Sequence, residues 1–218
     1  MERISKRVSE YLSSNPCAMN SLQLGIVNYS SLARFLMKQL KTQKYNAVLA
    51  AIKRYPEANP SLESSYRSAL MESRLEAYLS ITNITVRNSI KNFEAVSDIY
   101  GKIFERGGRI RIVQGNQGIV IVTDRKNSSE IIRHYPGDQI ISVRENLAEL
   151  VIISPLIIEN LRGYVAYISS ILAVNGINVY QVAAFYNDIT YIMDDKYMNR
   201  AVTVISSLTS GQVELQRP

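Results

Sequence analysis

The chain has 218 residues, 46% of them hydrophobic and 20% charged, with a formal net charge of +6, which is the balance of a folded globular protein rather than a disordered one. Its single cysteine, Cys17, and single histidine, His134, exclude a zinc finger, a disulfide framework and a Ser/His catalytic pair. It contains no GxxxxGK(S/T) or GxGxxG phosphate-binding run and no apolar run long enough to span a bilayer. We therefore expect a cytoplasmic protein that is not an enzyme, with no cofactor and no membrane partner.

The positive charge is concentrated in the first third of the chain. Residues 1–67 carry ten basic and four acidic side chains, an excess of six, whereas residues 68–218 carry fifteen of each. Such asymmetry predicts different partners for the two parts. Two explanations stay open: the first part binds a polyanion, or it is a small helical unit with a solvated basic face.

Residues 1–60 are predicted to form a domain of short helices. Apolar residues at helical spacing indicate a first helix over residues 2–12, stopped at Ser13 to Pro16, and a short element over residues 22–27. The run Asn28-Tyr29-Ser30 offers N-cap chemistry to a third helix that continues to Leu40. After a polar break at residues 41–44, a last helix runs from about Tyr45 to Tyr55.

This succession resembles a helix-turn-helix or winged-helix module, although no wing hairpin follows Tyr55. The resemblance implies that the last helix enters a major groove of DNA, that Asn46 reads an adenine edge and that basic side chains bind phosphates. The alternative for each residue is an ordinary solvated side chain. The candidate DNA-binding residues are Arg34, Lys38, Lys41, Lys44, Asn46, Lys53 and Arg54.

Apolar residues at helical spacing continue from Leu62 to Leu79 and predict a linker helix, assigned to residues 61–76. This helix either packs the first domain on the rest of the chain or transmits a signal between the two.

The remaining residues are predicted to use one βαββαβ pattern twice, over residues 77–146 and 147–218. Strands over residues 77–87, 109–113, 119–123 and 139–143 alternate with helices over residues 92–106 and 128–135. The second copy has strands over residues 147–156, 175–182, 189–193 and 213–215. Its helices cover residues 160–174 and 194–208. The pattern predicts an α+β protein with ferredoxin-like sheets.

The second copy also resembles an ACT domain, the regulatory module of aspartate kinases. The resemblance rests on four runs: Glu159-Asn-Leu-Arg-Gly163-Tyr-Val165, Leu172-Ala-Val-Asn-Gly176-Ile-Asn178-Val179, Ile189-Thr-Tyr-Ile-Met-Asp194-Asp195 and Asn199-Arg-Ala-Val-Thr-Val204. Gly108 pairs with Gly176, and Asp124 with Asp194, so Ala95 is expected where the second copy has Gly163, and the first copy is interpreted as a degenerate ACT-like repeat. The whole chain resembles uncharacterised archaeal regulators.

The ACT resemblance implies a small effector, usually an amino acid, held where the first strand of the module meets its first helix. A glycine there lets backbone N–H groups approach a carboxylate, which the N-terminus of a helix favours. Capping and strand-edge chemistry are the alternative explanation of the same residues. The candidate ligand-binding residues are Asn160, Leu161, Arg162, Gly163 and Asn178.

Two functions therefore follow. The first is a DNA-binding transcriptional regulator whose ACT-like body senses an amino acid and forms a homodimer through the ACT-like repeats. The second is a regulatory subunit that binds an amino acid and partners a biosynthetic enzyme, without binding DNA. A metal site at Asp124, Asp194 and Asp195 is rejected because acidic residues that open a helix are explained by capping. No catalytic residue is proposed.

Overall fold

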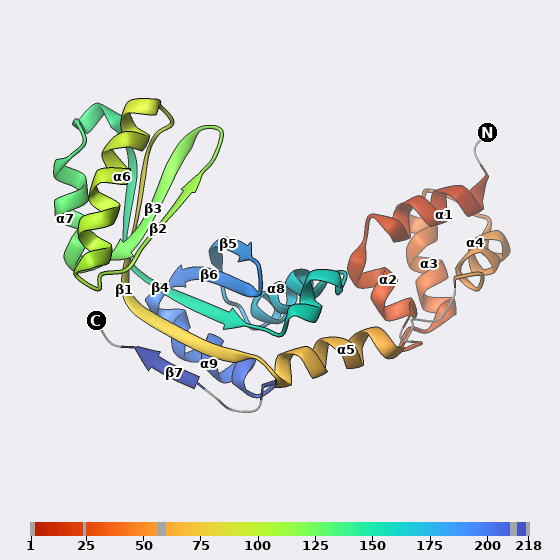
Figure 1. Cartoon of the computed structure of the whole chain (residues 1–218). Helices are drawn as coiled ribbons and strands as arrows, with labels where there is room; N and C mark the ends of the chain where they lie inside the picture. Colours follow the sequence, from red (N-terminus) through yellow and green to blue (C-terminus); the bar gives the residue numbers. More distant parts are fainter. Residues whose placement is uncertain (1–2, 24, 56–59, 210–212, 217–218) are drawn as a thin grey trace. The chain divides into compact units, whose positions relative to one another are not determined.

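The computed structural model describes residues 3–23, 25–55, 60–209 and 213–216. The backbone divides into two compact units, Met1–Leu62 and Glu63–Pro218. Figure 1 shows the helices of the first unit in red and orange and the sheet of the second in yellow to blue.

The first unit is helical. It contains α1 (Ile4–Ser13), α2 (Pro16–Gln23), α3 (Tyr29–Gln39) and α4 (Tyr45–Ile52). The side chains of Val8, Leu12, Leu36, Val48 and Ile52 are fully buried in one core that joins α1, α3 and α4. The Asn28 side chain caps α3 by accepting a 3.0 Å hydrogen bond from the Ser31 N–H, as the sequence predicts.

The first helix ends at Ser13, as predicted, but two other predictions for this unit are wrong in detail. The short element predicted over residues 22–27 is instead α2, which begins at Pro16, because proline is well tolerated in the first turn of a helix. α4 ends at Ile52 rather than Tyr55. Lys41 lies in the break between α3 and α4 with φ at +46°. The helix-turn-helix likeness of α3 and α4 stays a prediction.

The second unit is built on one seven-stranded sheet. Its strands are β1 (Arg74–Arg87), β2 (Ile110–Gln114), β3 (Gly118–Asp124), β4 (Ile140–Ile153), β5 (Val179–Phe185), β6 (Asp188–Asp194) and β7 (Val213–Gln216). The order across the sheet is β2-β3-β1-β4-β6-β5, and β7 pairs in parallel with the first half of β1. All other pairs are antiparallel.

The strands β1 and β4 are 14 residues long and run through two lobes. In the first lobe, β3 pairs with β1 from Ile81 onwards, and β2 extends the sheet beyond β3. In the second lobe, β6 pairs with β4 from Leu147 onwards, and β5 extends the sheet beyond β6. Ser80 and Asn146 both have φ at +57° and lie where the β1–β4 register shifts, so each long strand bends at a left-handed residue.

Helices cover one face of each lobe (Figure 1). In the first lobe, α6 (Ile90–Glu105) and α7 (Arg125–Arg133) pack on a core that includes Ile84, Ile99, Ile121 and Ile131. In the second lobe the covering helices are α8 (Tyr164–Val174) and α9 (Met198–Ser206), and the end of α5 (Pro60–Met71) adds Ala69 and Leu70 to the same core. The short 3-10 helices are η1 (Gly137–Gln139), η2 (Leu156–Asn160) and η3 (Asp195–Tyr197).

The strand pairing corrects the predicted boundaries. Residues 140–153 form one strand rather than two separate ones. The linker helix ends at Met71 rather than at residue 76, and β1 starts at Arg74 rather than at residue 77. The second lobe also does not close with its own last strand. The first half of β1 lies beside β4, where a βαββαβ unit would place β7, and β7 lies outside it.

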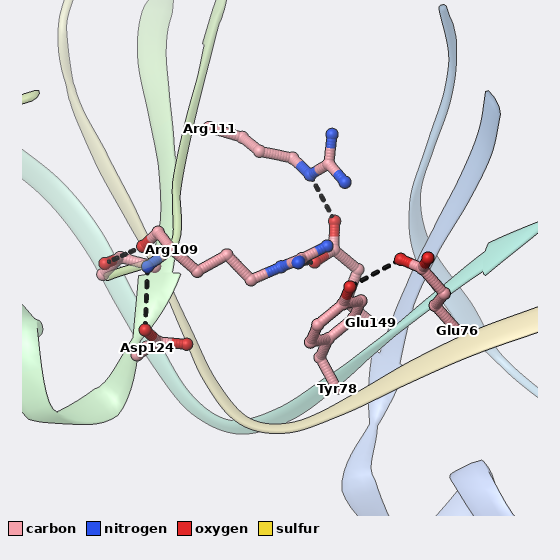
Figure 2. Close-up of polar contacts among 7 residues, drawn as sticks. Glu76, Tyr78, Arg109, Arg111, Asp124 and Glu149 are labelled. Atoms are coloured by element: carbon pink, nitrogen blue, oxygen red, sulfur yellow. Dashed lines mark hydrogen bonds and ion pairs between the residues drawn. The ribbon is translucent and has the colours of Figure 1, made fainter. Parts of the chain in front are cut away.

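The open faces of the two lobes meet at a buried carboxylate (Figure 2). Glu149, on β4, is completely buried, and its Oε2 lies 2.6 Å from Arg109 Nε. Its Oε1 lies 2.7 Å from Arg111 Nε, as an ion pair without hydrogen-bond alignment. The Arg109 guanidinium stacks 3.2 Å above the centre of the Tyr78 ring. The Tyr78 hydroxyl donates a 2.5 Å hydrogen bond to Glu76, and burial raises the pKa of Tyr78.

Candidate functional site

A pocket of about 490 Å³ opens beside the start of α8, a volume in the range of small-molecule sites. It is mostly apolar, and Glu159 is the acidic residue of its lining. The lining residues are Ile158, Glu159, Leu161, Gly163, Tyr164, Val165, Ala166, Ala184, Tyr186 and Ile189.

The loop between β4 and α8 builds one wall of this pocket. It covers residues 154–163 and ends at Gly163, the N-cap of α8, whose φ is +81°. A left-handed backbone is cheap for glycine and strained for other residues, so glycine is favoured there on conformational grounds. A Cβ at this position would also lie 3.1 Å from the Tyr66 hydroxyl oxygen.

The first turn of α8 contributes Tyr164, Val165 and Ala166 to the lining of the pocket. The N–H group of Tyr167 donates a 2.8 Å hydrogen bond to the Gly163 carbonyl, which is the first i to i−4 bond of the helix. The amides of Val165 and Ala166 precede this bond, so the helix itself offers them no acceptor. Because the positive end of the helix dipole lies at this turn, the pocket favours a carboxylate there.

The β5–β6 hairpin contributes Ala184, Tyr186 and Ile189 to the lining. Tyr186 lies in the turn of this hairpin with φ at +54°. Asn187 ties the turn to the end of β4, because the Ser154 N–H donates a 2.9 Å bond to the Asn187 carbonyl and the Asn187 side chain donates a 3.0 Å bond back to the Ser154 carbonyl. These two bonds join the hairpin turn to the start of the β4–α8 loop.

A group of tyrosines and serines supports the pocket from α5 and the end of β4. The Tyr66 ring stacks on Tyr167 with 4.8 Å between ring centres. The buried Tyr164 hydroxyl lies 3.2 Å from Ser154 Oγ and 3.5 Å from Ser73 Oγ. Burial raises the pKa of Tyr164, and its contacts with the two serines oppose that shift. The phenol is thus neutral and acts as a structural hydrogen-bonding group.

The structure brings together some of the predicted ligand-binding residues and separates one. Leu161 and Gly163 line the pocket. Asn160 and Arg162 lie in the same loop, but their side chains are exposed and outside the lining. Asn178 precedes β5 at the far end of α8, an 11-residue helix about 16 Å long, so it is not near the other four. Ligand binding by these residues stays a prediction.

Sequence reasoning missed the residues that complete the pocket. Tyr186, Ala184 and Ile189 come from the β5–β6 hairpin, which pattern alone could not place against the β4–α8 loop. Glu159 could have been predicted from the sequence, because it is an acidic residue immediately before the predicted run of ligand-binding residues.

The first lobe contains no equivalent loop. There β1 ends at Arg87 and Ser89 caps α6, so only two residues replace the ten of the second lobe. The alignment of Ala95 with Gly163 is wrong, because Ala95 lies inside α6 and packs on the core. The alignment of Asp124 with Asp194 is consistent with the structure, since each precedes a helix with nearly equal backbone angles.

All seven candidate DNA-binding residues are exposed. Arg34 and Lys38 lie on α3, Lys41 and Lys44 in the following break, and Asn46 on α4. Lys53 and Arg54 follow the end of α4. Within the described part of the chain, none of the seven side chains takes part in an ion pair. Their charges therefore face solvent.

The described residues contain no group of three or more His, Cys, Asp or Glu side chains able to hold a metal ion. Within the same ranges, no helix has the length and apolar character needed to cross a membrane.

Residues 142–207 match the family model of the ACT domain. This segment contains the β4–α8 loop, α8, β5, β6 and α9, and hence the whole lining of the pocket. The match to the ACT domain therefore falls mainly in the second lobe. The sequence matches no curated protein.

Among solved structures, the chain is similar to regulatory parts of aspartate kinases. A C-terminal regulatory domain from Porphyromonas gingivalis is 16% identical over 63% of this chain and 96% of its own, with a TM-score of 0.48. The ligand-free regulatory subunit from Thermus thermophilus is 18% identical over 64% of this chain and 97% of its own, with a TM-score of 0.49.

A third structure is a longer protein. Escherichia coli aspartokinase III, in complex with aspartate and ADP, is 13% identical over 62% of this chain and 32% of its own, with a TM-score of 0.47. These three come from bacteria, and the likeness to archaeal regulators stays a prediction.

Proposed function

We propose that this protein is a non-catalytic regulatory subunit that binds an amino acid in the second-lobe pocket and acts on a biosynthetic partner enzyme. The observation that supports it is the pocket at the N-terminus of α8, inside the segment that matches the ACT domain. The first lobe, with its related order of strands and helices, is interpreted as a second ACT-like repeat that lacks the ten-residue loop.

The chemistry of the lining favours an α-amino acid with an uncharged side chain. Its carboxylate would accept hydrogen bonds from the first-turn amides of Val165 and Ala166. Its ammonium group would pair with Glu159, the acidic residue of the lining. The apolar remainder of the lining, including Ile158 and Ile189, would then contact the side chain.

Regulation would pass through α5. The Tyr66 hydroxyl donates to the carbonyl of Arg162 in the pocket loop, and the Tyr66 ring stacks on Tyr167 of α8. A ligand that orders this loop would also fix α5, which leads back along the chain to residues 1–62. In this interpretation the basic first unit is the part that meets the partner enzyme.

The test is a thermal-shift and calorimetric titration of the full chain with each of the twenty common amino acids. We expect at least one aliphatic or small amino acid to raise the melting temperature in proportion to the logarithm of its concentration. Glu159→Gln should weaken binding about tenfold or more, whereas Glu145→Gln, an exposed carboxylate in the first lobe, should not. Twenty negative titrations would overturn the proposal.

A second candidate function is DNA binding by the first unit. The seven exposed candidate residues, six of them basic and without acidic partners in the described ranges, favour it. Binding of random-sequence duplex at 50 and 200 mM salt decides between the two: affinity that falls steeply with salt supports a DNA-binding regulator. Absence of binding at 50 mM salt would exclude DNA binding, and the regulatory-subunit proposal would then stand by itself.

A further inference from the structure

The strand β5 lies at a free edge of the sheet, and its sequence does not protect that edge. Within the described residues β5 pairs with β6 alone. Natural proteins often place a charged residue or a proline on such an edge, which prevents pairing with another chain. β2 carries Arg111, β7 carries Glu214 and the half of β4 that β6 does not reach carries Arg144. The seven residues of β5 include neither a charge nor a proline.

The last four residues of β5 leave this edge accessible. Val182–Phe185 pair with β6 in regular register, after an irregularity near Tyr180 at the start of the strand. The exposed fractions are 47% for Val182 and 46% for Phe185, and Ala184 is exposed as well. The backbone groups that point away from β6 can therefore pair with a further strand.

The side of α8 that faces β5 carries small side chains. Ala166 of α8 and Ala184 of β5 line the same pocket, so the Ala166 side of the helix faces the strand. Ser170 and Ala173, four and seven residues after Ala166, lie on that side of α8 and are exposed. Small residues there leave space beside the helix for the side chains of a further strand.

The pocket lies where such a strand would place a side chain. Residues that lie opposite each other on neighbouring strands point to the same face of a sheet. The residue opposite Ala184 would therefore point toward the pocket, whose lining is mostly apolar. The residue two positions away would lie opposite Val182, on the same face. Because α8 and β5 contain no charged residue, both positions favour apolar side chains.

We propose that β5 binds an extended, uncharged segment of the partner enzyme, which adds to the sheet as a further strand and places one apolar side chain in the pocket. Main-chain hydrogen bonds along β5 hold the segment, and the two apolar positions select its sequence. This contact is additional to that of the first unit. The pairing itself does not depend on an amino-acid effector.

The segment and a free amino acid compete in this arrangement. An amino acid in the pocket occupies the place of the side chain opposite Ala184, so each ligand weakens the binding of the other by the same factor. This competition rests on the proposed function. The two proposals fail separately, because the segment is measured without amino acids and the amino acids are titrated without a segment.

The probe is a library of random nonapeptides, acetylated and amidated at their ends, selected on the full chain. We expect the selected sequences to carry aliphatic or aromatic residues at two positions separated by one residue, and few charges. Replacing the side chain that enters the pocket with glycine should weaken binding about tenfold or more. A library that yields no peptide bound more tightly by the wild type than by Val182→Lys would overturn the proposal.

A matched pair of edge variants locates the binding site. Val182→Lys puts a charge on the β5 edge and should raise the dissociation constant of a selected peptide about tenfold or more. Val143→Lys changes a residue of similar exposure, 40%, on the half of β4 that β6 does not reach, and should leave binding unchanged. Equal losses in both variants contradict the proposal. A wild-type dimer that Val182→Lys dissociates would assign the edge to a second copy instead.

Backbone methylation of a selected peptide tests the pairing without any change in the protein. In a paired strand, alternate N–H groups point toward the neighbouring strand and the others point away from it. Methylation of one alternate set of amide nitrogens should abolish binding, and methylation of the other set should leave it nearly unchanged. Equal effects of the two sets would show that the peptide does not add to β5 as a strand.

Discussion

The Tyr66 hydroxyl donates a 2.5 Å hydrogen bond to the carbonyl oxygen of Arg162, which lies 96 residues further along the chain. This bond fastens the helix that leaves the first unit to the loop that builds the pocket. It joins two segments that the sequence gives no reason to associate.

Removing the hydroxyl should loosen the pocket loop without disturbing the packing. Tyr66→Phe keeps the ring that stacks on Tyr167 but leaves the Arg162 carbonyl without its donor. We expect a loss of about 0.5–1.5 kcal/mol in unfolding free energy. Amide hydrogen exchange over residues 160–167 should accelerate as well. Tyr55→Phe, in the first unit, is the control, and equal acceleration of that loop in both variants would contradict the role of Tyr66.

The left-handed backbone conformation at Gly163 leads to a second prediction. Gly163→Ala must hold a side chain at a φ of +81° and place a Cβ 3.1 Å from the Tyr66 hydroxyl. We expect a destabilisation of about 1–2 kcal/mol in thermal denaturation. Gly137→Ala is the matched control, since its φ is ordinary and no heavy atom lies within 4 Å of the added carbon. It should be neutral or slightly stabilising, and the reverse order would show that the turn tolerates a side chain.

The buried carboxylate of Glu149 should matter far more than an exposed one on the same strand. Glu149→Gln removes the charge that faces Arg109 and Arg111, which leaves two guanidinium groups without a counter-charge. Breaking one side of a buried ion pair costs about 3 kcal/mol or more. Glu145→Gln breaks an exposed pair with Arg125 at 3.8 Å, worth under about 1 kcal/mol. Urea denaturation of both variants measures the difference, and equal losses would contradict it.

Because two tyrosine side chains are buried, the folded protein should lose stability at high pH. Burial raises the pKa of Tyr135 and of Tyr191 from the usual 10.0 to about 12. Between these values the folded state holds protons that the unfolded state has released, so stability is complete below pH 10 and falls as pH rises towards about 12.

Tyr191→Phe tests this expectation. The variant loses the hydroxyl's contact with Ser169 and its bond to the Val165 carbonyl, each 3.2 Å, so it should be less stable by about 1 kcal/mol at pH 8. Its urea midpoint should then fall less steeply than that of the wild type between pH 10 and 11.5. Parallel slopes would assign the alkaline loss to other groups.

Local pattern predicted the order of helices and strands in the second unit, because periodicity and turn residues are properties of short windows. It did not predict that β1 and β4 are continuous. In β4, Asn146 interrupts the apolar pattern with a polar residue, although the strand passes through it. In β1 the predicted strand passed through Ser80, but residues 74–76 were assigned to the linker helix. The position of β7 outside β1 depends on pairing between segments more than 130 residues apart, which no local signal encodes.

Some residues of the candidate site could likewise be predicted from the sequence, and others could not. Gly163 and Leu161 were predictable, since a glycine before an apolar helical run indicates a turn with exposed amides. Tyr186 was not, because its place opposite that turn depends on the Ser154–Asn187 bonds between two loops. Asn178 was misplaced because its distance from Gly163 is set by the length of α8.

Both lobes use the strands β1 and β4. The segment that matches the ACT domain is therefore shorter than the unit that folds. Residues 142–207 alone would lack the first half of β1, whose Leu75 and Ala77 are fully buried beside β4. A fragment cut at those limits would expose an apolar strand edge and aggregate. The smallest piece that can fold is therefore the whole second unit, and its two lobes should unfold in one cooperative step although the ACT match falls mainly in one of them.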